Sequence, residues 1–431
     1  MRILHVVQRY YPAIGGAELY MEEISARLAA AGHQVTVFTS DALDSDLFLD
    51  PGRRRAVELS GTHRGVQVDR FPVRHLPASQ TTYLGLRRLM LLLSDVPPVP
   101  NRLLSWLANY TPWVPELWDW VDSHAGEYDV VGATTTAFEP FVAAGLRVAR
   151  RQRIPFVCHP LTHLGVGPEP GTDANSRLYV MRHQVGLVAA SDAVVAMTAA
   201  EKDYYVDQGV EADKISVIGP GVTPDAVLGG SGQRFRERHG IQGPIVLAIG
   251  AMTANKGTVQ NVEAIRHLWQ AGREVELVLI GAVLPTFETY LGQLPAADRQ
   301  RIHVLGAVGD QEKRDALAAA TIYSMPSRSD SFGITYLEAW LYGLPVIGAH
   351  SWGVTDVIDE GRDGMLVAYD DAPELAGAIA YLLDFPDVAS RMGLAGRQKV
   401  YARHTWKIKM RMIQQVYREL VQPPVPVKGE E

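Results

Sequence analysis

Two carboxylates and a glycine turn lie close together in the last third of the chain. Residues 326–340 read Pro326-Ser327-Arg328-Ser329-Asp330-Ser331-Phe332-Gly333-Ile334-Thr335-Tyr336-Leu337-Glu338-Ala339-Trp340. Asp330 and Glu338 stand eight positions apart, and the second carboxylate opens an apolar run that ends at residues 343–345. The pattern predicts a loop that enters a helix N-terminus, where backbone N–H groups favour an anion. Carboxylates at both ends of such a loop can accept hydrogen bonds from several hydroxyls, so we expect a site for a phosphorylated sugar.

The length and composition of the chain limit its class. A chain of 431 residues with 47% hydrophobic and 21% charged residues is expected to form two globular domains. The net charge of −7 argues against nonspecific nucleic-acid binding, which needs a basic surface. Cys158 is the single cysteine, which excludes an intrachain disulfide and fits a reducing compartment. We find neither a signal peptide nor a run of about 20 apolar residues, and therefore expect a cytoplasmic protein.

Short β-branched runs alternate with amphipathic segments along the chain, which is typical of doubly wound parallel sheets. The first series of predicted strands covers Ile3–Val7, Gln34–Thr39, Tyr128–Ala133, Pro155–Cys158 and Ala193–Ala196. After a Pro/Gly-rich junction at residues 219–232, the second series covers Ile245–Ile249, Val275–Ile280, His303–Leu305, Ile322–Ser324 and Pro345–Gly348. The predicted domains span residues 1–218 and 219–395. A helical stretch, roughly Val388–Leu420, and a disordered tail at Pro423–Pro426 account for most of 396–431.

One segment of the first domain, residues 83–120, interrupts this alternation with many leucines and tryptophans. Arg87, Arg88 and Arg102 are interleaved with them. The segment is predicted to be a helical insertion packed on the first domain. An alternative is a partly exposed surface that contacts a membrane or a lipid-linked acceptor, because tryptophan and arginine both suit a membrane interface.

Two loops that follow predicted strands have the composition of phosphate-binding turns. Gly15-Gly16 lies between the first strand and the first helix, where the backbone can approach a phosphate at a helix N-terminus. Its spacing differs from the dinucleotide motif G-x-G-x-x-G, and a plain tight turn is the alternative. Lys256-Gly257 opens a helix after the strand that ends at Gly250, and the lysine could reach a diphosphate. A solvated surface lysine is the alternative there.

The histidines and aspartates offer further candidates. His159 follows a predicted strand at the sheet edge where ligands of α/β proteins bind, so we expect a functional imidazole; a structural histidine is the alternative. His159 and His163 have the spacing of a metal pair on a helix, but Pro160 makes that helix unfavourable. Asp44-Ser45-Asp46 matches an Asp-x-Asp metal signature, although its polar loop favours a solvated turn.

Taken together, these stretches resemble a retaining glycosyltransferase of the GT-B fold, in the family called GT4 or glycosyl transferases group 1. The resemblance covers the Gly15-Gly16 loop, His159, Thr198–Val222, Lys256-Gly257 and Leu305–Leu366. The spacing of Asp330 and Glu338 corresponds to the family's Glu-x7-Glu motif. The resemblance implies two Rossmann-like domains facing across a cleft, with the C-terminal helix returning to the first domain.

The resemblance also implies roles for individual residues. Gly15 and Gly16 would approach the diphosphate of a nucleotide-sugar donor, and Lys256 would neutralise that diphosphate as it leaves. Asp330 would hold the sugar hydroxyls and His159 would lie over the donor sugar. Glu338 would bind the ribose hydroxyls, and Val308 would flank the base. The family's loop residues that present backbone groups to sugar and phosphate correspond to Phe332, Gly333, Ile334 and Thr335.

The chain departs from the family pattern at three places. Ala251 replaces the arginine that usually follows the strand-ending glycine, so one of two cations for the diphosphate is missing. Asp330 replaces a glutamate, and residues 220–223 read Pro-Gly-Val-Thr in place of Asn-Gly-Val-Asp. Arg328, in the same loop as Asp330, could supply the missing charge.

The sequence thus predicts a retaining, metal-independent glycosyltransferase without a cofactor, which moves a sugar from a nucleotide-diphosphate donor to a glycan or lipid-linked acceptor. We expect no nucleic-acid partner, and peripheral contact with the inner membrane face through residues 83–120 is open. The alternatives are a nucleotide-sugar-binding protein without turnover, which Ala251 favours, and a GT-B sugar-nucleotide epimerase.

Overall fold

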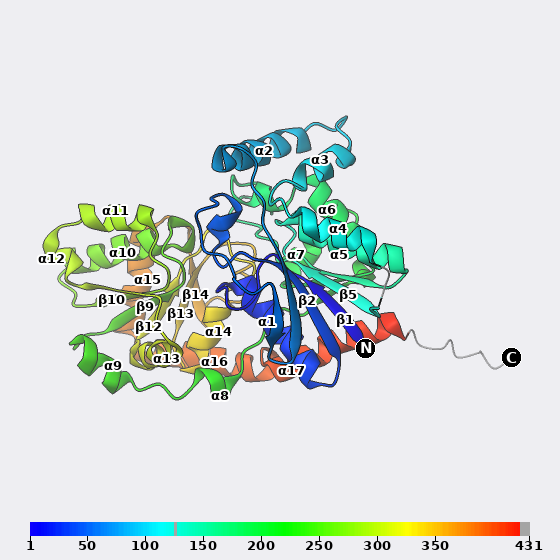
Figure 1. Ribbon diagram of the computed structural model, residues 1–431. Helices are drawn as coiled ribbons and strands as arrows, with labels where there is room; N and C mark the ends of the chain where they lie inside the picture. The colour runs from blue at the N-terminus through cyan, green and yellow to red at the C-terminus, as the bar shows by residue number, and fades with distance from the viewer. Residues whose placement is uncertain (125–126, 423–431) are drawn as a thin grey trace, which may run out of the picture. The chain divides into compact units, whose positions relative to one another are not determined.

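Two compact units make up the protein. The computed structural model describes residues 1–124 and 127–422, so the predicted tail at residues 423–426 lies outside the described residues. The first unit comprises Met1–Thr162, Ala174–Gly219 and the described chain from Met410; the second comprises His163–Asp173 and Pro220–Lys409. Because the last helix ends in the first unit, the predicted return of the C-terminal helix is confirmed (Figure 1).

The first unit contains an eight-stranded sheet in the order β3-β4-β2-β1-β5-β6-β7-β8. Its strands are β1 (Arg2–Val6), β2 (Gln34–Ser40), β3 (Ser60–His63), β4 (Val66–Phe71), β5 (Val130–Thr134), β6 (Phe156–His159), β7 (Ala193–Ala196) and β8 (Ile215–Val217). All neighbours are parallel except β3 and β4. The chain leaves β1 toward β2 and leaves β5 toward β6. Their carboxyl ends therefore mark a topological switch point.

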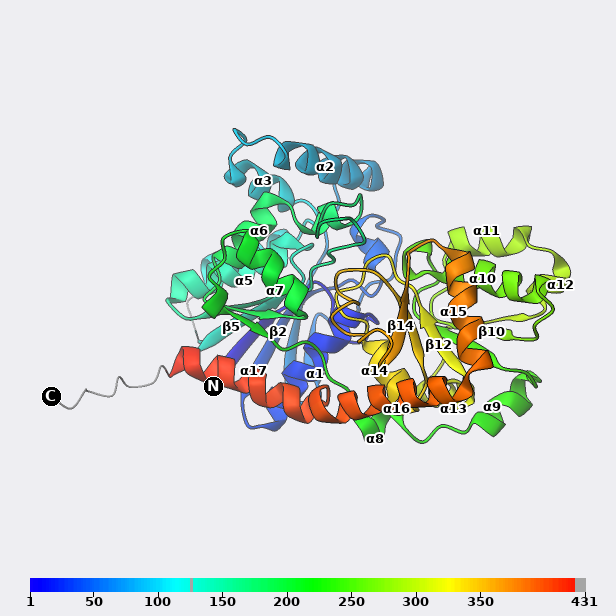
Figure 2. The same ribbon diagram turned by 180° about the vertical axis from the view of Figure 1, so that it is seen from behind.

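The helices of the first unit connect these strands. They are α1 (Gly16–Ala30), α2 (Ser79–Ser94), α3 (Asn101–Ala108), α4 (Pro115–Ser123), α5 (Glu139–Gln152), α6 (Arg182–Ala189) and α7 (Ala199–Asp207), with 3-10 turns η1 (Ser45–Phe48), η2 (Ser176–Tyr179) and η3 (Ala212–Lys214). Right-handed crossovers on the two sides of the switch point cover opposite faces of the sheet. Figure 2 shows α5, α6 and α7 close together within this unit.

The second unit contains a six-stranded parallel sheet in the order β11-β10-β9-β12-β13-β14. Its strands are β9 (Ile245–Ile249), β10 (Glu276–Ile280), β11 (Ile302–Gly306), β12 (Ile322–Met325), β13 (Val346–Ala349) and β14 (Gly364–Val367). Its helices are α8 (Pro224–Val227), α9 (Gly232–His239), α10 (Thr258–Gln270), α11 (Pro285–Gln293), α12 (Ala296–Arg299), α13 (Asp310–Ala319), α14 (Ile334–Leu341), α15 (Ala372–Asp384) and α16 (Pro386–Arg403), with the 3-10 turn η4 (Ala254–Lys256). The helix α17 (Trp406–Val421) begins in this unit.

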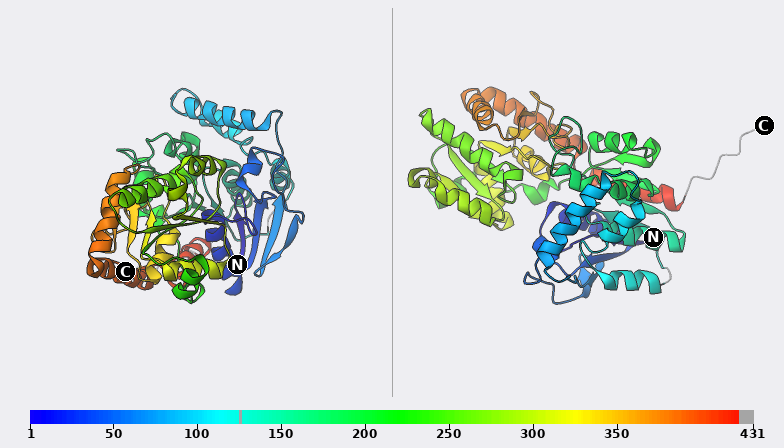
Figure 3. Two further views of the ribbon diagram at one scale, coloured as in Figure 1. Left: turned by 90° about the vertical axis from the view of Figure 1, so that its left-hand side faces the viewer. Right: turned by 90° about the horizontal axis from the view of Figure 1, so that it is seen from above.

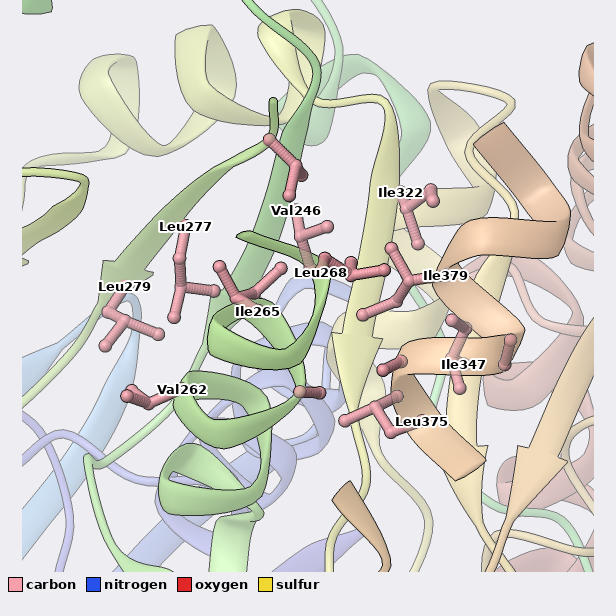
Figure 4. Packing of buried hydrophobic residues seen from close by; sticks show 14 of the residues in the cluster. Val246, Val262, Ile265, Leu268, Leu277, Leu279, Ile322, Ile347, Leu375 and Ile379 are labelled. Carbon is pink, nitrogen blue, oxygen red and sulfur yellow. The ribbon is translucent and has the colours of Figure 1, made fainter. Parts of the chain in front are cut away.

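A dense apolar core fixes the second sheet against its helices. Figure 4 shows strand residues such as Val246, Leu277 and Ile322 facing Ile265 of α10 and Ile379 of α15. These five side chains are completely buried. Each contributes roughly 1.5–3 kcal/mol of hydrophobic stabilisation. The strands of this sheet therefore hold their carboxyl ends rigidly, which matters for the side chains that follow them.

The structure also shows elements that the sequence pattern did not predict. The strands β3, β4, β8 and β14 are absent from the predicted series, and β3 makes the first sheet mixed rather than wholly parallel. The predicted single helical stretch over 388–420 is two helices, because the chain breaks at His404–Thr405. There the chain forms a bridge between Val222 and Thr405, and Gly221 approaches the backbone of Trp406 so closely that a Cβ would lie 2.7 Å from its nitrogen.

The segment 83–120, for which the sequence predicts a helical insertion, contains most of α2, all of α3 and part of α4. Helices α2 and α3 lie side by side, as Figure 3 shows in two further views. A small core of Met90, Leu104, Leu107, Ala108 and Met181 joins this pair to the start of α6. None of the helices formed by the described residues is both long enough and apolar enough to cross a bilayer.

Candidate active site

The predicted site residues of the second unit gather at the switch point of its sheet. Strands β9 and β12 are neighbours, and the chain leaves them toward opposite edges of the sheet. Ligands of open α/β sheets bind at this place, beyond the carboxyl ends of the strands. The loop after β9 leads to Lys256, and the loop after β12 leads to Asp330.

Lys256 and Asp330 form an ion pair at this switch point. The Lys256 Nζ atom lies 2.6 Å from Asp330 Oδ2. The turn η4 presents the lysine, because Thr253 Oγ1 accepts a hydrogen bond from the Lys256 backbone N–H. Gly257 then adopts φ +71° and passes so close to Pro326 that a Cβ would lie 2.5 Å from the Pro326 carbonyl oxygen. The close approach of these two loops therefore depends on glycine at position 257.

The charges around Asp330 keep it ionised. Burial acts to raise the pKa of Asp330, but the charge of Lys256, followed by His163 and hydrogen bonds from Lys256 and the Phe332 backbone, lowers the pKa below its ordinary value. A carboxylate held in this state can accept hydrogen bonds from ligand hydroxyls, while the ammonium group of Lys256 offers three donors.

Glu338 lies at the end of the same segment but inside a helix. Gly333, with φ +87°, precedes Ile334, the first residue of α14, so Glu338 occupies the second turn of that helix rather than the point, predicted from the sequence, where the loop enters it. Its Oε1 atom accepts a hydrogen bond from Lys313 Nζ at 2.8 Å. Its Oε2 atom is buried and has no hydrogen-bond partner among the described residues. A buried carboxyl oxygen without a partner calls for a donor, which a ligand hydroxyl could supply.

The other predicted donor-site residues of this unit lie at the start of α14 and in the loop after β11. Phe332 is buried, and its ring centroid lies 5.5 Å from that of His404. Thr335 Oγ1 accepts a hydrogen bond of 2.6 Å from Tyr323 OH. Ile334 and Thr335 begin α14, and Val308 is half-buried in the loop between β11 and α13. Because α14 starts at the switch point, the backbone N–H groups of its first turn point out of the helix end there.

His159 occupies a different environment from the one that the sequence predicts. It is the last residue of β6 in the first unit and is completely buried. Tyr20 OH lies 2.9 Å from His159 Nδ1 and Tyr417 OH lies 3.4 Å from His159 Nε2. Burial, reinforced by the nearby His5, lowers the pKa of His159 to about 3. The imidazole is thus a neutral core group, which agrees with the structural alternative and not with a side chain placed over a ligand.

His163 is the histidine that joins the carboxylate site. It belongs to the second unit, and its Nδ1 atom donates a hydrogen bond of 3.2 Å to the Ser329 carbonyl oxygen. Burial lowers the pKa of His163; Asp330 opposes this effect and Lys256 adds to it. By its sequence spacing, His163 is a candidate only as half of a metal pair. Its position in a Gly-rich loop beyond the end of β6 is the signal that could have identified it.

The Gly15-Gly16 turn closes the switch point of the first unit. Gly16 begins α1, and a Cβ added to it would meet nothing within 4 Å, so space remains on that side of the backbone. At Gly15, in contrast, a Cβ would lie 2.1 Å from the Glu18 carboxylate. Glu18 is buried and lies 2.8 Å from Arg9 Nη2. The turn thus packs Gly15 against the Glu18 carboxylate and leaves the backbone open at position 16.

Ala251 and Arg328 are the two positions that the sequence links to the missing cation. Ala251 is exposed and lines a hollow together with Lys256, so no side-chain charge stands at this position. The Arg328 guanidinium lies 3.4 Å from Asp173 and 5.7 Å from the ring centroid of Tyr369, so it already has a carboxylate partner.

Both aspartates of the Asp44-Ser45-Asp46 sequence are paired with arginines. Asp44 accepts hydrogen bonds from Arg54 at 2.8 and 2.9 Å, and Asp46 lies 3.6 Å from Arg53. These contacts agree with a structural turn. Within residues 1–124 and 127–422, no group of three or more His, Cys, Asp and Glu side chains is arranged to hold a metal ion.

Comparisons with protein families assign both halves of the chain. Residues 15–221 match the model of a glycosyl transferase 4-like domain, and residues 243–384 match the model of glycosyl transferases group 1. The D-inositol 3-phosphate glycosyltransferase of Xylanimonas cellulosilytica is 28% identical, over 91% of this chain and 88% of the relative. The MMP alpha-(1->4)-mannosyltransferase of Mycolicibacterium hassiacum is 24% identical, over 98% of each chain.

Solved structures of other proteins have the same fold. HepE of Anabaena in complex with UDP superposes with a TM-score of 0.70 at 20% identity, covering 97% of this chain and 100% of HepE. The sucrose-phosphate synthase of Thermosynechococcus elongatus gives a TM-score of 0.70 at 19% identity, covering 97% and 99%. The predicted GT-B fold is confirmed by these likenesses together with the two sheets.

Proposed function

Because this chain belongs to the glycosyltransferases, with a 4-like domain followed by a group 1 domain, we propose that it is a retaining enzyme that uses a nucleotide-diphosphate sugar as its donor. The observation that carries this proposal is the Lys256–Asp330 ion pair at the switch point of the second sheet; the buried, unpartnered Oε2 atom of Glu338 supports it. HepE of Anabaena has been crystallised with UDP and with UDP-glucose, which supports a donor of this class.

The chemistry of the departing diphosphate agrees with the charges at this site. When the bond between sugar and diphosphate breaks, positive charge develops on the sugar and negative charge on the phosphate. Lys256 and the backbone N–H groups at the start of α14 would stabilise the phosphate. These groups can do the work that a metal ion does in other transferases, and we propose a reaction without metal or cofactor.

Each donor-binding residue keeps a separate role in this proposal. Asp330 would accept hydrogen bonds from the sugar hydroxyls, and Oε2 of Glu338 would accept one from the ribose. Val308 would flank the base. We assign to His163 the role over the donor sugar that the sequence suggested for His159, since its Nδ1 atom donates to Ser329 and its Nε2 atom then carries a lone pair.

A membrane-proximal acceptor is supported by one surface of the first unit, the α2–α3 face. Its exposed apolar residues are Leu84, Leu89, Leu92, Val96, Leu103 and Trp106. Arg88 and Arg102 are exposed on the same helices, whereas Arg87 is buried and pairs with Glu139 at 2.7 Å. We propose that this face binds an anionic membrane from the cytoplasmic side and that the acceptor is lipid-linked. A Trp106→Ser/Leu92→Ser variant should lose co-sedimentation with anionic vesicles at low salt. Absence of binding by the unchanged protein would remove this part of the proposal.

A donor screen tests the main proposal and separates it from its alternatives. Thermal unfolding is measured with UDP-, GDP- and ADP-sugars and with the free diphosphates, because a ligand that binds only the folded protein raises its stability. Products are then followed by NMR at the anomeric position, with and without EDTA. We expect one nucleotide class to stabilise the protein, and transfer or slow hydrolysis with retained configuration that EDTA leaves unchanged. Tight binding without sugar release would favour the binding protein, and donor conversion without an acceptor would favour the epimerase.

A further inference from the structure

A short segment between β6 and η2 belongs to the second unit although both flanking elements belong to the first. We call this segment, His163–Asp173, the strap. The backbone N–H of Trp352 donates to the Gly165 carbonyl oxygen at 3.0 Å, and the Trp352 indole Nε1–H donates to that of Gly167 at 3.0 Å. A single tryptophan therefore holds the middle of the strap at two points.

The end of the strap has a second anchor. The Asp173 carboxylate, of which only 9% is exposed, lies 3.4 Å from the Arg328 guanidinium. The same carboxylate accepts a hydrogen bond of 3.1 Å from the Val166 backbone N–H. Asp173 thus closes the strap on itself and ties it to the residue that precedes Ser329 and Asp330. A charge pair of this exposure is stronger than a solvated surface pair.

Both anchors are built into the loops that carry the donor site. The Arg328 backbone N–H donates to the Asn255 carbonyl oxygen at 2.8 Å, directly before Lys256. Gly353, directly after Trp352, approaches the Asp330 backbone so closely that a Cβ would lie 2.2 Å from its carbonyl oxygen. The strap is therefore held by the neighbours of Lys256 and Asp330, and its first residue, His163, donates to Ser329.

We propose that Trp352 and Asp173 are positioning residues, which hold the strap so that the His163 imidazole is fixed beside Asp330 and Lys256. This inference rests on the proposed function, in which His163 acts over the donor sugar. Neither anchor needs to touch the donor. Loosening the strap lowers the fraction of molecules with His163 in place, and misplacement of a reacting group by about 1 Å can cost about 100-fold in rate. Nucleotide binding at Glu338 does not depend on that placement.

The test compares Trp352→Phe and Asp173→Asn with Glu169→Gln, an exposed change in the strap, as the control. With a nucleotide sugar as substrate, we expect each anchor variant to lower kcat by about tenfold or more while the Kd for the nucleoside diphosphate stays within about twofold. Trp352→Phe should cost almost nothing further in a His163→Gln background, because the tryptophan acts through that histidine. An equal loss in both backgrounds, or a parallel loss of nucleotide affinity, would overturn the proposal.

A second measurement needs no turnover and so separates failure of this inference from failure of the proposed function. Nitrogen-15 NMR of the His163 ring should show a neutral ring protonated at Nδ1 in the unchanged protein. In Trp352→Phe the signals should move toward those of a solvated imidazole with mixed tautomers. An unchanged His163 signal in both anchor variants would contradict the strap's role even if no donor sugar is ever turned over.

Discussion

The Nζ atom of Lys256 lies 2.6 Å from Oδ2 of Asp330, which joins the loops that leave the two central strands of the second sheet. The two residues are 74 positions apart in the chain. Their meeting follows from the parallel pairing of β9 with β12, whose carboxyl ends lie at one edge. The pair is thus a product of sheet topology, and it sets both the charge and the geometry of the donor site.

Removing the lysine tests the role of that charge. Lys256→Met should lower kcat/KM for the donor by about 10²–10³, since the preorganised positive charge that stabilises the departing phosphate is lost. The same change leaves the Asp330 carboxylate without its cation, so the pKa of Asp330 should rise. Steady-state kinetics measures the first effect. Lys407→Met, at an exposed position, is the control, and a Lys256 variant within twofold of the unchanged enzyme would exclude this role.

The unpaired oxygen of Glu338 predicts a preference for ribose. Glu338→Gln keeps the shape of the side chain but weakens an acceptor that faces a ligand hydroxyl, so the Kd for the nucleoside diphosphate should rise about 10- to 100-fold. Calorimetry with ribo- and 2′-deoxyribonucleoside diphosphates gives the sharper measurement. The unchanged protein should prefer the ribonucleotide, and the variant should lose most of that preference. A preference of equal size in both proteins would place the ribose elsewhere.

Restoring the missing cation should strengthen diphosphate binding. Ala251 is exposed beside Lys256, so Ala251→Arg adds a guanidinium without burying it. We expect about 1 kcal/mol, or about fivefold, tighter binding of the nucleoside diphosphate and a smaller effect on the monophosphate. The control is Ala254→Arg, which adds the same charge at an exposed position in the same turn. Equal effects of both arginines would mean that only the overall charge matters.

The buried histidines of the first unit predict sensitivity to acid. The pKa values of His159 and His5 are about 3 in the folded protein, below the ordinary value of 6.5. Between these values the unfolded chain binds the protons that the folded chain excludes. The contribution of these neutral histidines to the free energy of unfolding is therefore complete above pH 6.5. As the pH decreases from 6.5 toward 3, the free energy of unfolding falls by about 1.4 kcal/mol per pH unit for each histidine.

Denaturant unfolding at a series of pH values measures this slope. His159→Gln should lower the overall stability, because Tyr20 and Tyr417 lose a partner. It should also reduce the slope of the unfolding free energy against pH by the amount that corresponds to about one proton. His267→Gln changes an exposed histidine and should leave the slope unaltered. A slope in His159→Gln as steep as in the unchanged protein would show that His159 is not held neutral.

The strands, and the site residues that directly follow them, could be predicted because they depend on local sequence pattern. Apolar runs such as Ile245–Ile249 fall on strands because a parallel sheet buries both faces. Lys256 and Asp330 were found because each follows such a strand. The sequence predicts that the helix begins near Glu338, whereas α14 begins at Ile334, because Gly333 takes a left-handed backbone angle that the local pattern does not specify.

The surroundings of His159 and His163 could not be predicted, because they depend on partners far away in the chain. His159 is covered by Tyr20 and Tyr417, which are 139 and 258 positions distant. The strap that carries His163 is held by Trp352, 185 positions from its carbonyl partner Gly167. No local pattern encodes these contacts, so sequence spacing favoured the histidine at the strand end.

In the proposed function, Lys256 and Glu338 bind the donor of a glycosyltransferase. The most direct measurement is calorimetric binding and turnover of UDP-, GDP- and ADP-sugars by the unchanged protein, Lys256→Ala and Glu338→Ala. We predict that at least one donor is bound and turned over, that Glu338→Ala weakens donor affinity by about tenfold or more, and that Lys256→Ala mainly lowers turnover. Donor affinity and turnover that stay unchanged in both variants would contradict the site.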